Sequence, residues 1–264
     1  MPVSPIERND HTEPNAEAFI FGFDFPSEGV VNKVDWEKEK PTAACPSAGW
    51  RWLHFNRLAD ETRDWLENHS GLDETVISAL LQSETRPRCA SYEDGLLLNL
   101  RGINHNPGAE PEDMISVRIW AANNIVISMR SYPVKAIHEV RQETASGDAA
   151  TSPGGLVVSI AERLVDNSEP VLEQLKEEAD EFEELLLSGK ERLPPAELAE
   201  FRRTILLLRR YILPQREAMT QLQKEGRTLF DDDHQIHLRE TADRITRIAE
   251  EPDSIRDRAA VLQY

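Results

Sequence analysis

The richest group of candidate metal ligands lies in residues 231–237, where three aspartates are followed closely by two histidines. His234 and His237 are three residues apart, so on a helix they share a face and could hold one cation together with an acidic neighbour. The candidate ligands are Asp231, Asp232, Asp233, His234 and His237. Acidic residues are also typical of a helix N-terminus, and two histidines alone rarely form a metal site. The group is therefore either a metal site or a capping run followed by exposed histidines.

A second acidic group occupies residues 173–184, where seven carboxylates stand against the single base Lys176. On a helix this composition is typical of a solvated face. Repeated around a symmetric assembly, it would concentrate divalent cations through a summed negative potential. The residues assigned to this cation-focusing role are Glu173, Glu177, Glu178, Asp180, Glu181 and Glu184.

The other residue types that perform chemistry form no recognisable pattern. Cys45 and Cys89 are soft ligands, but neither lies in a CxxC or CxxH spacing, and the remaining histidines occur singly. The sequence contains no nucleophile elbow, no P-loop and no GxGxxG motif. We therefore expect no enzymatic activity and no organic cofactor.

The composition limits the classes of partner. The 264 residues include 30 Lys+Arg and 48 Asp+Glu, which gives a formal net charge of −18. This acidic excess argues against binding to nucleic acid or to an anionic lipid surface, because both require clustered basic residues. Two cysteines are too few for a disulfide framework and indicate a reducing compartment. No apolar run approaches the roughly 20 residues of a membrane helix, so we expect a soluble cytoplasmic chain as given.

The elements that must position these residues differ between the two halves of the chain. Residues 18–153 contain all five tryptophans and several stretches rich in β-formers, and they predict an α/β sheet subdomain after a flexible N-terminus at 1–17. The expected strands cover residues 19–25, 50–55, 96–100, 115–120 and 125–129. Asn123–Asn124 is a plausible hairpin turn between the last two strands. Two short helices are expected, one capped by Asp60 and one capped by Asp73, and a further helix is expected over 134–143.

Residues 154–264 are predicted to be helical throughout. Apolar residues recur every three or four positions from Val157 to Phe182, from Leu198 to Leu222 and from Leu238 to Leu262. Pro214 lies within the second pattern and is expected to kink that helix. The third pattern predicts an oligomer or stalk seam made of Leu238, Ile245, Ile248, Ile255 and Leu262. It is still in register at Tyr264, so we expect a truncated stalk helix that would lead to a first membrane helix.

Several short stretches occur in an order and spacing that is typical of one protein family. They are Glu84–Cys89, Asp94–Gly102, Asn104–Gly108, Glu112–Trp120, Ile127–Arg130, Arg209–Glu217 and His237–Asp243. These stretches resemble the ZntB zinc-transport branch of the CorA superfamily of divalent-metal ion transporters. Arg209–Glu217 is similar to the proline-bearing helix of that superfamily, and His237–Asp243 to the head of its stalk helix. The resemblance covers nearly the whole chain, from Phe19 to Tyr264.

The resemblance implies an α+β fold. An N-terminal mixed β-sheet flanked by helices (α/β/α) would be followed by long antiparallel and stalk helices, as in the soluble domain of CorA. It implies the cytoplasmic funnel domain of a homopentameric divalent-metal transporter, which gathers cations and couples metal binding to the pore. Zn²⁺ would be the transported or regulatory ion. The partners would be identical subunits and divalent cations, with no nucleic acid and no membrane contact by this part itself.

The resemblance also implies a location and two missing segments. The domain would lie on the cytoplasmic side of the bacterial inner membrane. In the family, two membrane helices with a Gly-Met-Asn-like signature follow at the C-terminus, and this sequence contains neither.

Three alternatives compete with a zinc transporter domain. A Mg²⁺ or Co²⁺ channel of the same superfamily would favour hydrated carboxylate sites over Cys and His ligands. A soluble coiled-coil oligomerisation or interaction protein would use the long helices as a platform, with its natural end near Tyr264. A metal-dependent hydrolase would need three convergent ligands and an open coordination position, which a His-x-x-His pair alone does not supply.

Overall fold

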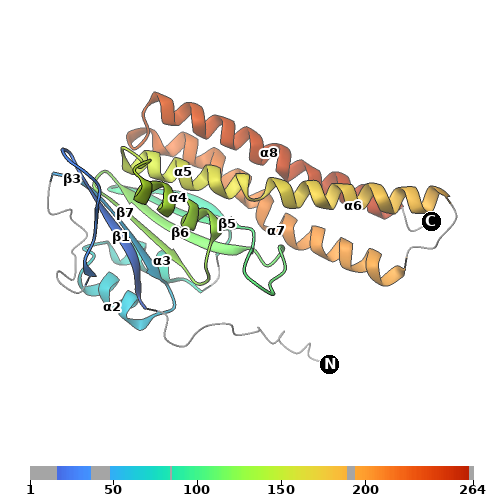
Figure 1. Cartoon of the computed structure of the whole chain (residues 1–264), viewed down its shortest axis with the longest axis horizontal. Coiled ribbons are helices and arrows are strands. Elements are labelled where there is room, and N and C mark those ends of the chain that lie inside the picture. The colour runs from blue at the N-terminus through green and yellow to red at the C-terminus, as the bar shows by residue number, and fades with distance from the viewer. Residues whose placement is uncertain (1–16, 37–47, 84, 189–193, 262–264) are drawn as a thin grey trace.

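The structure is a computed structural model that describes residues 17–36, 48–83, 85–188 and 194–261. Within residues 186–188, 227 and 251–261 it describes the backbone alone. A seven-stranded sheet lies at one end of the molecule, and long helices pack on it and extend beyond it (Figure 1).

The sheet is mixed. Its strands are β1 (Phe19–Pro26), β2 (Asn32–Lys33), β3 (Gly49–Asn56), β4 (Arg88–Tyr92), β5 (Gly95–Gly102), β6 (Ile115–Ala122) and β7 (Ile125–Arg130). Their order is β2-β1-β3-β7-β6-β5-β4, and every neighbouring pair is antiparallel except β3 and β7. Asn123–Asn124 makes the turn between β6 and β7, so the predicted hairpin is confirmed.

Two short helices, α2 (Asp60–Asn68) and α3 (Glu74–Leu81), cover one face of the sheet. Trp65 of α2 stacks on Phe55 of β3, with ring centroids 4.6 Å apart. The Asp73 carboxylate caps α3 by accepting a hydrogen bond from the backbone N–H of Thr75 at 2.8 Å, as predicted. The prediction that Asp60 caps α2 is wrong, because the N-cap is Ala59 and Asp60 lies in the first helical turn.

The opposite face is covered by α4 (Lys135–Ser146), α5 (Pro153–Asp166) and α7 (Pro195–Glu225). Strand alternation separates the two faces: Leu96, Leu98 and Leu100 of β5 belong to the core under these helices, whereas Leu97 belongs to the core under α2 and α3. Ser152 caps α5 by accepting a hydrogen bond from the backbone N–H of Gly155 at 3.0 Å.

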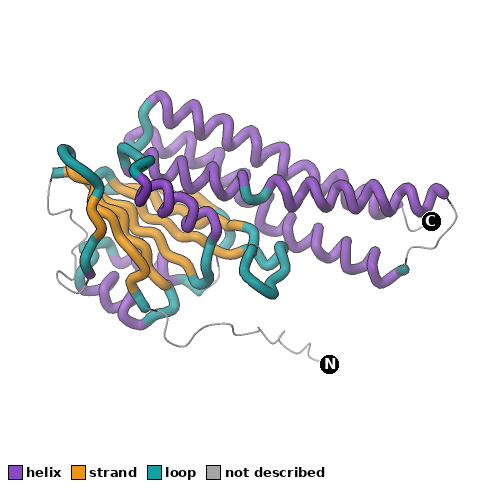
Figure 2. The backbone as a smooth tube through the Cα atoms, viewed as in Figure 1, coloured by secondary structure: helices purple, strands orange, loops and turns teal. Residues whose placement is uncertain are grey.

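The remaining helices are α6 (Glu169–Ser188) and α8 (Asp232–Val261), with a 3-10 turn at Gly226–Thr228 between α7 and α8. Beyond the sheet, α6 runs beside parts of α7 and α8 (Figures 1 and 2). The apolar pattern from Val157 to Phe182 is divided between two helices, because α5 ends at Asp166 and α6 begins at Glu169. By contrast, α7 continues as one helix through Pro214.

The predicted fold class is confirmed: a mixed sheet with helices on both faces precedes long helices. Strands β2 and β4 were not predicted. One apolar core extends from the sheet into α5–α8, so the predicted parts 18–153 and 154–264 share it. In the described ranges, no helix is both long enough and apolar enough to cross a membrane.

Candidate functional site

The predicted ligand group lies at the start of α8, where this helix packs on α5. Asp231 directly precedes α8, and its Oδ1 accepts a hydrogen bond from the backbone N–H of His234 at 2.9 Å. The same oxygen lies 2.8 Å from Nδ1 of His234. Asp232 and Asp233 follow in the first turn, with exposed side chains. Asp231 therefore acts as the helix cap, as one of the two interpretations expects.

The two histidines have different neighbours. His234 is 16% exposed and packs on the first turn of α5, where Gly155 leaves room for its ring: a Cβ at Gly155 would lie 2.9 Å from Nε2 of His234. His237 is 58% exposed, and its Nδ1 lies 2.9 Å from Oε1 of Glu162 in α5. Each histidine thus has an acidic neighbour of its own, Asp231 or Glu162.

Across the described part of the chain, no group of three or more His, Cys, Asp or Glu side chains is arranged to hold a metal ion. Either His–carboxylate pair would give a cation two protein ligands, and water or another subunit would have to supply the rest. The predicted ligand group stays a prediction. Glu162 is a neighbour of this group that sequence reasoning missed.

An ionic network connects α8 to three other helices. Arg244 of α8 donates to Asp166 at 2.7 Å and to both carboxylate oxygens of Glu169 at 2.9 and 2.8 Å. Arg163 of α5 donates to Asp166 at 3.0 Å and to Glu143 of α4 at 2.9 Å. The hydrogen bonds to Glu169 and Asp166 raise the pKa of Arg244. The network ties α8 to the joint between α5 and α6.

The predicted cation-focusing residues lie along α6. Five of them are exposed, and Glu178 is half-buried. Burial raises the pKa of Glu178, and the negative charges of Glu181 and of Glu197 in α7 raise it further. Lys176 is 3.9 Å from Glu173, and its single positive charge offsets only one of the seven carboxylates in residues 173–184. The structure thus places an acidic surface on the helix that extends beyond the sheet (Figure 1).

Three of the five predicted seam residues are buried within the chain itself. Leu238, Ile245 and Ile248 are at most 6% exposed and belong to the core that α8 forms with its neighbouring helices. The side chain of Ile255 and the whole of Leu262 lie outside the described residues. At these three positions α8 packs on other helices of the same chain. On the other face of α8, Ile236 is 58% exposed.

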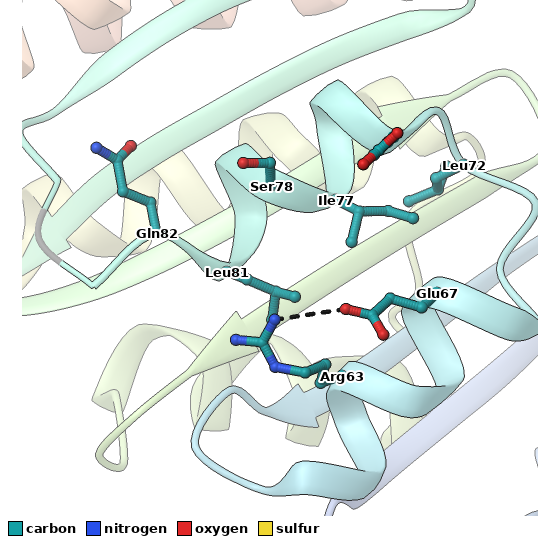
Figure 3. Close-up of a pocket in the computed structure, with 8 residues that line it drawn as sticks. Arg63, Glu67, Leu72, Ile77, Ser78, Leu81 and Gln82 are labelled. Atoms are coloured by element: carbon teal, nitrogen blue, oxygen red, sulfur yellow. Dashed lines mark hydrogen bonds and ion pairs between the residues drawn. The ribbon is translucent and has the colours of Figure 1, made fainter.

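Two concave surfaces of the described structure lie away from these residues. A groove of about 580 Å³ runs between α2 and α3, with Leu72, Ile77 and Leu81 among its apolar lining residues (Figure 3). Arg63 and Glu67, 3.4 Å apart, form an ion pair beside it. A second depression, of about 770 Å³, lies next to the turns at 92–94 and 123–124. Neither contains a predicted site residue.

Sequence reasoning located the acidic residues but missed the network that binds α8. The carboxylates that contact α8 are visible in the sequence as Glu162, Asp166 and Glu169, which are three or four residues apart. Glu162 contacts His237, and the other two bind Arg244. That spacing also occurs on any solvated helix face, so it does not identify a partner. Arg244 is 75 residues from Glu169, and their pairing depends on how the helices pack.

Comparisons with known proteins agree on one family. A family model described as "CorA-like Mg2+ transporter protein" matches residues 47–264. The "Divalent cation transporter CmaX" of Pseudomonas aeruginosa is 36% identical over 214 residues, which cover 80% of this chain and 64% of the relative. The "Zinc transport protein ZntB" of Pectobacterium carotovorum is 34% identical over 212 residues, with the same coverage of both chains. The chain thus spans 64% of the length of these curated relatives.

Solved structures show the same likeness. The full-length CmaX protein superposes with a TM-score of 0.84 at 32% identity, over 96% of this chain and 77% of that one. The ZntB cytoplasmic domain from Vibrio parahaemolyticus superposes with a TM-score of 0.80 at 27% identity, over 94% of this chain and 96% of that one. The CorA magnesium transporter from Methanocaldococcus jannaschii, at 15% identity and a TM-score of 0.74, shares the fold.

Proposed function

This chain belongs to the CorA-like Mg²⁺ transporter family, and on that premise we propose that it is the cytoplasmic funnel domain of a divalent-cation transporter with Zn²⁺ as its cargo. The observation that carries the proposal is the superposition on a ZntB cytoplasmic domain over 96% of that domain's length. The relatives named above are transporters, in agreement with the expectation that the chain is not an enzyme.

The proposed setting is the cytoplasmic side of the bacterial inner membrane, with five identical subunits around one axis. The sheet part, residues 18–153, would form the wide end of the funnel, and the helical part, residues 154–264, would lead toward the membrane. Long helices that extend from one side of the sheet support this arrangement (Figure 2).

The acidic surface of α6 supports a role in gathering cations. Five of its six assigned carboxylates are exposed, and the chain carries a net charge of −18. Five copies around an axis would sum these charges into a negative potential that raises the local concentration of divalent cations. The role belongs to the surface as a whole, because each exposed carboxylate alone is largely screened.

Two observations bear on which cation is carried. The relatives named ZntB, and the His–carboxylate pairs at the start of α8, favour Zn²⁺, because imidazole is a zinc ligand and magnesium prefers oxygen. The family description names Mg²⁺, which favours the second candidate, a Mg²⁺ or Co²⁺ channel. The coiled-coil platform has less support, because the relatives named above are transporters.

Ion flux through the natural gene product distinguishes these candidates. The protein would be reconstituted into liposomes that contain a divalent-cation indicator, and Zn²⁺, Co²⁺ and Mg²⁺ would be supplied in turn. We expect Zn²⁺ to enter at the lowest concentration. Entry of Mg²⁺ or Co²⁺ in preference to Zn²⁺ would favour the second candidate, and no flux of any cation would favour the coiled-coil platform.

A further inference from the structure

One edge of strand β5 is completed by a side chain. Strand β4 pairs with β5 only from Gly95 to Asn99, whereas β5 continues to Gly102. Beyond Asn99, the side-chain amide of Gln215 in α7 makes the two hydrogen bonds with the backbone of Arg101 that a neighbouring strand would otherwise make. Its Oε1 accepts from the backbone N–H of Arg101 at 2.6 Å, and its Nε2 donates to the backbone C=O of Arg101 at 2.9 Å. The amide of Gln215 thus replaces one residue of a missing strand.

The side chain of Arg101 makes a second contact with α7. Tyr211, one helical turn before Gln215, lies under the guanidinium of Arg101, which is 4.4 Å from the ring centroid. Gln215 is fully buried, so the loss of its amide would leave the N–H and C=O of Arg101 without a partner on that side. The backbone of Arg101 is therefore bound to one turn of α7, and its guanidinium, which donates to the C=O groups of Met114 and Thr85, stacks on the same turn.

The apolar contacts of α7 do not specify its position along its own axis. Apart from Ala218, its buried residues recur at spacings of three and four: Leu198, Phe201, Ile205, Leu208, Ile212, Gln215, Met219 and Leu222. If α7 slid by one turn, most apolar side chains would again meet apolar side chains. A single polar residue in such a seam selects one register, because every other register leaves it buried without a partner.

We propose that Gln215 is a positioning residue that locks the register of α7, and of the α8 helix packed on it, against strand β5. The lock acts through the paired amide of Gln215 and the backbone of Arg101. Within the proposed function, it would be the point at which a movement of the sheet part is passed to the helices that lead toward the membrane. The lock itself does not depend on transport, and its test needs none.

Distances between spin labels report the register directly. In the 264-residue chain with Cys45→Ser and Cys89→Ala, one label is placed on exposed Glu61 of α2 and a second on exposed Ala199 or Glu217 of α7, each site changed to Cys. A slide of α7 along its axis changes at least one of the two distances. The test variant is Gln215→Met, which keeps the size of the side chain and removes both hydrogen bonds.

The matched control is Thr241→Val in α8. Thr241 is 1% exposed in the same core, but its hydroxyl donates only within its own helix, to the C=O of His237 at 2.8 Å. We expect one narrow distance distribution for the wild type and for T241V. We expect an additional or shifted distance in Q215M, displaced by up to about 5 Å, because a slide of one helical turn moves each label on α7 by that length along the helix axis.

An unchanged distance distribution in Q215M would overturn the proposal, whatever its thermal stability, because a residue that only stabilises would lower the Tm without moving the helix. If Q215M does not fold, Gln215→Asn serves the same comparison. It keeps the amide but shortens the side chain by one methylene, so it cannot reach both partners in the wild-type register. A wild-type distribution in that variant would equally overturn the proposal.

Discussion

At the scale of single residues, His54 of β3 is a buried base whose charge state has consequences for stability. Its side chain is 0% exposed, its Nδ1 lies 2.7 Å from the hydroxyl of Ser128, and its Nε2 is buried without a hydrogen-bond partner in the described structure. Burial lowers the pKa of His54 well below its usual value, and the positive charges of Arg130 and Arg141 lower it further. The folded protein therefore holds this imidazole neutral.

This pKa shift predicts a loss of stability in mild acid. Below about pH 6.5 the unfolded chain binds a proton at His54 that the folded protein does not, so the free energy of unfolding falls by about 1.4 kcal/mol per pH unit until the folded pKa is reached. His54→Gln removes this contribution. We expect urea unfolding of the wild type to lose about 1 kcal/mol more than H54Q between pH 7.5 and 5.5. The control is His138→Gln at an exposed position of α4, and equal losses in wild type and H54Q would contradict the prediction.

At the scale of helices, the ionic network around Arg244 holds α8 against the joint between α5 and α6. Arg244→Met keeps the aliphatic part of the side chain but leaves Asp166 and Glu169 without their shared donor. Hydrogen bonds between charged groups contribute about 1.5–3 kcal/mol, so we expect the free energy of unfolding to fall by at least about 1 kcal/mol. Thermal or urea unfolding measures this loss.

The matched control for Arg244 is Arg63→Met, which breaks the exposed 3.4 Å pair with Glu67 on α2. Exposed pairs of this kind contribute about 0.5 kcal/mol or less, so R63M should unfold almost as the wild type does. In a double-mutant cycle between R244M and Glu169→Gln, the double variant should lose less stability than the sum of the losses in the two single variants. Equal effects of R244M and R63M would mean that the network does not hold α8.

The elements themselves were largely predictable from the sequence. Strands β1, β3, β5, β6 and β7 appear as stretches of β-formers, and α7 and α8 as long apolar periodicities. The break between α5 and α6 was not predictable, because Asn167 and Ser168 are compatible with a helix and the apolar spacing continues through them. The hydrogen bonds of Gln215 to the backbone of Arg101 were not predictable either, although a kink was predicted at the neighbouring Pro214. These two hydrogen bonds join residues 114 positions apart, which only packing can bring together.

The candidate site was predictable in its residue types but not in its geometry. The sequence identified His234 and His237 as a pair on one helix face, but only His237 gains an acidic neighbour from α5, Glu162, whereas His234 lies against Asp231 at the start of its own helix. The acidic face of α6 could be identified because an exposed surface needs no partner to form. Contacts between helices that are far apart in sequence, such as His237 with Glu162, have no local signal.

At the scale of the whole molecule, the central claim is that the acidic helices gather divalent cations for a pore. Such an effect is electrostatic and long-ranged, so it should depend on ionic strength and on many carboxylates together. The test variant changes Glu173, Glu177, Glu181 and Glu184 to Gln and Asp180 to Asn. The control variant removes five exposed acids from the sheet side instead: Glu61, Asp64, Glu67, Glu74 and Glu93.

The deciding measurement is the dependence of Zn²⁺ flux on Zn²⁺ concentration, in liposomes that contain the natural gene product or either variant, at low and at high salt. We expect the α6 variant to need a several-fold higher Zn²⁺ concentration for half-maximal flux at low salt, because the attracting charge is gone. This difference should largely vanish at high salt, where the Debye length shrinks to about 3 Å at 1 M. The control variant should behave as the wild type. Identical flux curves for the wild type and the α6 variant at low salt would contradict the claim.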